Sequence, residues 1–181
     1  MQDVSSQTTR RLPSLVFCLI AAAVLLIIAA GHILPLDTLE LDIDEVWSIW
    51  QGFGSPAEII RWTPYDWPWL YYLTLAGWQR LVGLDPLALR YLSVLAFMPG
   101  AALMFRVLRR WTNVQAGLLG MLAYAALEYS LFLSTEVRGY ALLLGLTPLA
   151  LWLTLRYFDR PNWRRGVALG VCLAAMFYTS F

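Results

Sequence analysis

Long runs of apolar residues, separated by short polar segments, make up most of the chain. The first run, LVFCLIAAAVLLIIAAGHIL from Leu15 to Leu34, has about 20 residues, and a helix of this length matches a hydrocarbon core roughly 30 Å thick. It exceeds the apolar core of roughly 7–15 residues in a signal peptide, so we interpret it as a retained anchor. Four more long runs follow: Leu87–Leu108, Val114–Leu133, Tyr140–Phe158 and Val167–Phe181. The pattern predicts an all-α fold, a polytopic transmembrane helical bundle with about five spans.

A shorter apolar run, Trp67–Val82, differs from the others. It has about 16 residues, carries Pro64 and Pro68 near its start, and is dense in aromatic side chains. A segment too short for a full span, with an aromatic face, is typical of a helix lying at the membrane interface. We therefore expect an interfacial juxtamembrane helix here.

The positions of the arginines set the expected topology, because all 13 basic residues of the chain are arginine. If Trp67–Val82 spans the membrane, five arginines share the side of the N-terminus; if it lies on the surface, nine do. The nine are Arg10, Arg11, Arg106, Arg109, Arg110, Arg156, Arg160, Arg164 and Arg165. Cytoplasmic loops carry the excess of basic residues, which favours the second arrangement. The N-terminus is then cytoplasmic, and residues 37–86 form a long outer loop.

Composition excludes several classes of protein. With 60% hydrophobic and 14% charged residues the chain is no soluble domain, and a net charge of +1 gives no sign of a nucleic-acid partner. We expect residues 1–11 to be a cytoplasmic polar tail, and residues 12–181 to be the N-terminal part of a transmembrane domain. The last apolar run stops at Phe181 without a polar flank, so we expect a chain truncated at its C-terminus. Cys18 and Cys172 lie inside spans and are expected to be small core residues.

The outer loop begins with a cluster of acids. Five carboxylates lie between residues 37 and 45 with no cation among them: Asp37, Glu40, Asp42, Asp44 and Glu45. The adjacent pair Asp44-Glu45 has three explanations at this point. It could belong to an ordinary solvated loop, it could place negative charge at the start of a short helix over Glu45–Trp50, or it could be a site for a cation or a proton.

A second group of ionisable residues is expected on the same outer face. Glu136 and Arg138 leave the membrane where the third span turns into the fourth, Glu128 lies about two turns deeper, and Arg90 begins the second span. Ionisable groups at membrane depth are costly and usually functional. Arginines can hold a phosphate while a carboxylate takes a proton from a hydroxyl, which suits a phosphate-bearing lipid substrate. Six of the nine tryptophans lie between residues 47 and 78, either as an interfacial belt or as a groove for a lipid chain or sugar ring.

Four segments in this order resemble the GT-C glycosyltransferases, particularly the bacterial protein O-mannosyltransferase-like and aminoarabinose-transferase-like members. The segments are LDIDEVWSIW, TPYDWPWLYYLTLAGWQRLVG, GLDPLALRYLSVL and STEVRGYALLL. The resemblance covers roughly Leu12 to Phe181, the front module of such an enzyme. It implies horizontal helices between the first two spans, as the arginine positions do independently. One feature differs: many relatives have His-Pro-Pro after an acid in this loop, whereas here Trp67, Pro68 and Trp69 follow Asp66.

The resemblance implies an enzyme of the inner (plasma) membrane that transfers a sugar from a polyprenyl phosphate to a hydroxyl on the outer face. By motif position, Asp44 is implied to be the catalytic carboxylate with Glu45 as its partner. Arg138, Glu136 and Arg90 are implied to lie near the donor phosphate. A divalent cation held by Asp44 and Glu45, either magnesium, manganese or calcium, is left open, as are the sugar and the acceptor. The single histidine, His32, is expected to be a satisfied helix residue rather than a ligand.

Two alternatives use the same residues differently. A transporter or flippase subunit for lipid-linked sugars would use the acids as a polar pathway, with broken helices meeting near the middle of the membrane. An assembly subunit would use the tryptophan-rich loop as a docking surface, and neither Asp44 nor Arg138 would then be needed.

Overall fold

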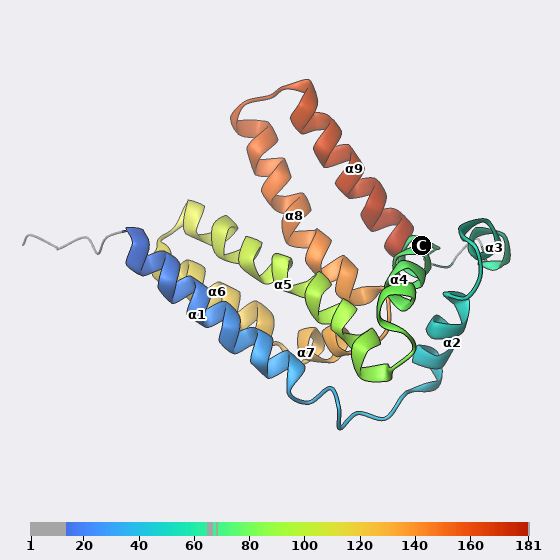
Figure 1. Ribbon diagram of the computed structural model, residues 1–181. Coiled ribbons are helices and arrows are strands. Elements are labelled where there is room, and N and C mark those ends of the chain that lie inside the picture. The colour runs from blue at the N-terminus through green and yellow to red at the C-terminus, as the bar shows by residue number, and fades with distance from the viewer. Residues whose placement is uncertain (1–13, 65–66, 68, 181) are drawn as a thin grey trace, which may run out of the picture.

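A computed structural model describes residues 14–64, 67 and 69–180, and the expected tail at residues 1–11 lies outside them. The described residues form helices and no strand (Figure 1). The helices are α1 Ser14–Ile33, α2 Ile43–Gln51, α3 Pro56–Trp62, α4 Trp69–Val82, α5 Pro86–Trp111, α6 Val114–Ala126, α7 Glu128–Thr135, α8 Tyr140–Asp159 and α9 Trp163–Ser180. The prediction of an all-α membrane bundle is confirmed.

Three segments of the described chain are long and apolar enough to cross a membrane: Leu19–Thr38, Pro86–Trp111 and Tyr140–Asp159. The predicted third span is bent by 60° between α6 and α7, and it makes a fourth crossing if the pair counts as one span. Leu127 leaves the helical conformation at the bend, and Glu128 starts a new helix with an exposed side chain. The predicted fifth span corresponds to α9, which carries Arg164 and Arg165 in its first turn and is not among the segments that qualify by length and apolarity.

The polar segment between α1 and α5 folds into three short helices at one end of the bundle (Figure 1). Helix α2 starts at a capping box. The Asp42 side chain accepts from the Glu45 amide, and the Glu45 side chain accepts from the Asp42 amide. Helix α3 starts at a second capping box, formed by Ser55 and Glu58. Helix α4, with 14 residues, is shorter than a span, in agreement with the expectation for Trp67–Val82.

Helices α5, α8 and α9 pack side by side, and α5 and α8 approach closely where each carries a glycine. A Cβ atom on Gly145 would lie 2.1 Å from the carbonyl oxygen of Ala96, and one on Gly100 would lie 2.7 Å from that of Leu144. The absence of side chains at these two positions therefore sets the distance between α5 and α8, which carry residues of the site at their ends.

Two clusters of buried side chains hold the helices together. One lies around α4 and includes Tyr71, Leu75, Leu89 and Val137. The other joins α1, α5 and α6 through residues that include Ile28, Phe97 and Met121. His32 is buried beside this second cluster, hydrogen-bonded to Ser134 over 2.5 Å and stacked on Phe97. It is a satisfied helix histidine, as the sequence predicted.

Candidate active site

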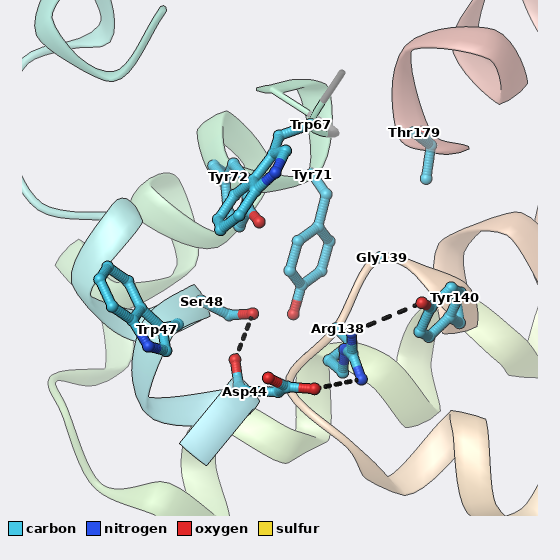
Figure 2. A pocket seen from close by; sticks show the side chains of 10 residues that line it. All are labelled: Asp44, Trp47, Ser48, Trp67, Tyr71, Tyr72, Arg138, Gly139, Tyr140 and Thr179. Carbon is cyan, nitrogen blue, oxygen red and sulfur yellow. Dashed lines mark hydrogen bonds and ion pairs between the residues drawn. The ribbon is translucent and has the colours of Figure 1, made fainter. Parts of the chain in front are cut away.

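A cavity of about 640 Å³ opens where α2, α4, the start of α8 and the end of α9 meet (Figure 2). Its wall contains two charged side chains, several aromatic rings and the hydroxyls of a serine, a threonine and three tyrosines. The lining residues are Asp44, Trp47, Ser48, Trp67, Tyr71, Tyr72, Arg138, Gly139, Tyr140 and Thr179. The cavity thus brings the acidic segment 37–45 together with the segment between α7 and α8, as the sequence predicted when it placed them at the same end of the bundle.

Asp44 and Arg138 form an ion pair at the edge of the cavity (Figure 2). Asp44 Oδ2 lies 2.9 Å from Arg138 Nη1, and both side chains stay accessible, at 49% and 31% exposure. The guanidinium also lies over the Tyr140 ring, 4.9 Å from its centre. An accessible arginine and an accessible carboxylate can each exchange their partner for a substrate at modest cost, because exposed ion pairs are weak.

Glu45, by contrast, is buried and binds Arg90. Its Oε1 accepts from Arg90 Nε at 3.0 Å and from the Val137 amide at 2.9 Å. Its Oε2 accepts from Arg90 Nη2 at 2.7 Å and from the Asp42 amide at 3.1 Å. Burial raises the pKa of Glu45, but the hydrogen bonds from Arg90, Val137 and Asp42 outweigh burial and hold the pKa below its ordinary value. All the acceptor positions of this carboxylate are used.

Arg90 is also fully engaged and does not line the cavity. Besides Glu45, its terminal nitrogens donate to the carbonyl oxygens of Leu36, Leu39 and Glu40, at 3.1, 2.7 and 2.8 Å. All five N–H donors of the guanidinium therefore have an acceptor. The Glu45–Arg90 pair ties the chain after α1, the start of α2, α5 and the segment after α7 into one unit. Asp44, the residue before Glu45, thereby lies at the cavity.

Glu136 lies beside the cavity without lining it. Its carbonyl oxygen accepts from Ser93 Oγ at 2.5 Å, whereas its carboxylate Oε2 is buried and has no hydrogen-bond partner among the described residues. Burial raises its pKa; Arg138 opposes this, and the nearby carboxylates of Glu45, Asp42 and Asp44 add to it. Glu136 therefore has a partly buried carboxyl group that protonates more readily than usual.

Tyr71 is a residue that the sequence did not single out for a role. It is 2% exposed, and its hydroxyl points toward the Asp44–Arg138 pair (Figure 2). The hydroxyl makes no well-formed hydrogen bond to a described residue, although the Ser93 side chain lies close enough to oppose the rise in the pKa of the phenol. Burial raises its pKa well above the ordinary value, so the phenol stays protonated. The sequence marked Tyr71 only as part of an aromatic face.

The geometry does not fit a cation shared by Asp44 and Glu45. Every acceptor position of Glu45 is filled by an N–H donor, and Asp44 lies against a guanidinium. In the described ranges, no three His, Cys, Asp or Glu side chains are grouped closely enough to hold a metal ion. Asp66, the acid after which the sequence departs from the pattern of the related enzymes, lies outside the described residues.

Comparison with known proteins gives one match. The family model described as dolichyl-phosphate-mannose-protein mannosyltransferase matches residues 66–181. Searches of curated proteins and of solved structures gave no match. The matched range contains Tyr71, Arg90, Glu136 and Arg138, whereas Asp44 precedes it.

Proposed function

Because the chain belongs to the dolichyl-phosphate-mannose-protein mannosyltransferase family of membrane glycosyltransferases, we propose that it transfers a sugar from a polyprenyl phosphate to an acceptor hydroxyl. The observation that supports this most is the accessible Asp44–Arg138 pair in the wall of an aromatic cavity. Enzymes of this family act within a membrane on a lipid-linked sugar donor, and the apolar helices of this chain suit that setting.

In the proposed reaction, Arg138 leaves Asp44 and binds the donor phosphate, and Asp44 accepts the proton of the attacking hydroxyl. The acceptor oxygen forms a bond to the anomeric carbon as the bond from that carbon to the phosphate oxygen breaks. The polyprenyl phosphate leaves with the bonding electrons, and Arg138 stabilises its added negative charge. Attack from the face opposite the phosphate inverts the anomeric configuration. Asp44 later gives its proton to water.

The other residues of the site are assigned supporting roles. The Tyr71 hydroxyl can donate a hydrogen bond to the sugar donor, because it makes no well-formed bond to a described residue. Trp47 and Trp67 offer faces on which a sugar ring can stack. Glu45 and Arg90 position Asp44 rather than contact substrate. Glu136, close to the cavity with a raised pKa, can hold or relay a proton near Arg138.

We further propose that the cavity faces the outside of the cell's inner membrane. The arginine distribution supports this orientation, because the end of the bundle away from the cavity carries most of the arginines. The helical runs also alternate in direction, so that the end of α1 and the starts of α5 and α8 lie at the cavity end (Figure 1). A hexose is the sugar that the family's description favours, and the acceptor stays open.

A transfer assay in detergent micelles separates this function from that of a flippase. The full-length protein is incubated with radiolabelled polyprenyl-phosphate mannose and an extract of acceptors, and the release of polyprenyl phosphate is followed. A micelle has no second leaflet, so a flippase gives no product there, whereas the proposed enzyme transfers the sugar. Release in the wild type that is absent without acceptor supports the proposal. No release under conditions in which the donor binds would overturn it.

A further inference from the structure

A second concave site lies at the other end of the bundle, between the ends of α5 and α8 and the start of α9. It has a volume of about 460 Å³. Four arginines and two other residues form most of its wall: Arg106, Trp152, Arg156, Asn162, Arg164 and Arg165. No acidic side chain lines it. We call it the arginine groove, and the proposed reaction does not use it.

Arg165 has a structural role in the groove, because its guanidinium is bound to backbone carbonyl oxygens. Its Nη1 donates to the carbonyl oxygens of Arg156 and Arg160, both at 2.9 Å, and its amide donates to Asn162 Oδ1 at 2.9 Å. These bonds satisfy carbonyls at the end of α8 that have no partner within the helix, and they fix the turn into α9. The groove therefore has a defined shape.

The other arginines of the groove have no acidic partner within ion-pair distance in the described part of the chain. Asp159, the acid at the end of α8, pairs with Arg110 outside the groove. Arg106, Arg156 and Arg164 are exposed, so three positive charges converge on a space lined by no acidic side chain; Asp159, beside the groove, acts on Arg156 and Arg165 only through its field. Such an arrangement favours an anionic ligand with several acceptor oxygens, and guanidinium groups suit phosphate in particular.

The surroundings of the groove favour a lipid as the source of that phosphate. Arg156 lies over the Trp152 ring and Arg164 over the Trp163 ring, 5.8 and 5.6 Å from the ring centres. Tryptophan prefers the headgroup level of a membrane. Along α9, Val171 lies one turn beyond the groove residue Ala168 and is 64% exposed, which suits contact with an acyl chain.

We propose that the arginine groove binds the headgroup phosphate of an anionic phospholipid, with Arg156 and Arg164 as the principal ligands. Basic pockets between membrane helices are a recurrent form of lipid recognition. The phospholipid would hold the ends of α5, α8 and α9 together at the membrane surface, at the end of the bundle away from the cavity.

Native mass spectrometry of the full-length protein tests the proposal. Phosphatidylglycerol and phosphatidylcholine with identical acyl chains are titrated into the detergent-purified protein, and the bound lipid is counted. The wild type should bind phosphatidylglycerol at least about tenfold more tightly than phosphatidylcholine. Arg156→Gln and Arg164→Gln should each remove most of this preference. Arg160→Gln is the matched control, because it removes the same charge four residues from Arg156 and does not line the groove.

Three results would overturn the proposal: equal binding of the two lipids by the wild type, an equal loss of preference in Arg160→Gln, or complete displacement of the lipid by inorganic phosphate at the same concentration. The last would assign the groove to a soluble anion. Thermal unfolding of each variant checks that it folds. If both groove variants unfold, the wild-type titration and the phosphate competition still decide the question.

Discussion

At the residue scale, the two adjacent carboxylates that the sequence brings to attention have different surroundings. Successive residues on a helix point about 100° apart, so Asp44 and Glu45 can have different surroundings although they are adjacent in sequence. Asp44 is exposed beside Arg138, whereas Glu45 is 2% exposed and bound to Arg90. The sequence could predict that the pair and Arg138 share one end of the bundle. It could not assign Arg90 to Glu45, because that contact joins residues 45 positions apart through tertiary packing.

Glu45→Gln should lower the stability of the protein by roughly 3–5 kcal/mol at neutral pH, because it leaves the Arg90 charge buried without its partner. The wild type should show a matching pH dependence. The native pKa of Glu45 is depressed below the ordinary value of 4.5, so its contribution is complete above that pH and is lost as the pH falls through the lower native pKa. Thermal unfolding from pH 7 to pH 3 measures both effects. A variant as stable as the wild type at pH 7 would contradict the stabilising role of the Glu45–Arg90 pair.

Tyr71→Phe should reduce sugar transfer without reducing stability. The substitution removes a buried hydroxyl that makes no well-formed hydrogen bond to a described residue, so the melting temperature should stay constant or rise. Turnover should fall, because the donor loses a hydrogen bond in the cavity. Tyr129→Phe, at an exposed tyrosine of α7, is the control. A marked loss of stability with normal turnover would make Tyr71 a structural residue only.

At the element scale, the apolar runs predicted the long helices well, and the short aromatic segment predicted α4. The bend between α6 and α7 was not predicted, because the residues around Leu127 include neither proline nor glycine. The close approach of α5 and α8 was also hidden in the sequence. A glycine in an apolar run indicates such a contact only once the facing residue is known. For Gly145 that residue is Ala96, on α5.

Gly145→Ala should destabilise the bundle by roughly 1–3 kcal/mol, because the new methyl group meets the Ala96 carbonyl oxygen, a backbone atom that cannot move alone. Gly170→Ala is the matched control, since a Cβ there has no neighbour within 4 Å and alanine favours the helix by roughly 0.5–1 kcal/mol. Unfolding temperatures of the two variants should therefore move in opposite directions. A parallel change in both would show that α5–α8 packing does not depend on Gly145.

At the scale of the whole molecule, the charges separate by sign. Acidic groups gather in the segment 37–45 and beside Arg138, and arginines gather at the ends of α5 and α8 and the start of α9. The sequence alone predicted this polarity, because it depends on the order of spans and loops rather than on packing. The cavity itself needed the folded chain, since its walls come from helices distant in sequence.

The proposed orientation predicts which loops a reagent outside the cell can reach. In a cysteine-free background, Glu58→Cys in α3 should react with a membrane-impermeant maleimide added to intact cells, because Glu58 is exposed and belongs to the outer segment. Asn162→Cys, exposed between α8 and α9, should react only after the membrane is permeabilised. The reverse pattern would place the cavity on the cytoplasmic side.

The central claim is that Asp44 accepts the proton in sugar transfer from a polyprenyl phosphate, and one measurement tests it most directly. The rate of sugar transfer and the affinity for the donor are measured for the wild type and for Asp44→Asn, with Glu40→Gln as a control at another exposed carboxylate of the same loop. Loss of a general base should slow transfer by roughly 100-fold or more. Donor binding and membrane insertion should survive in Asp44→Asn, and Glu40→Gln should behave as the wild type. Near-normal transfer by Asp44→Asn would contradict the account.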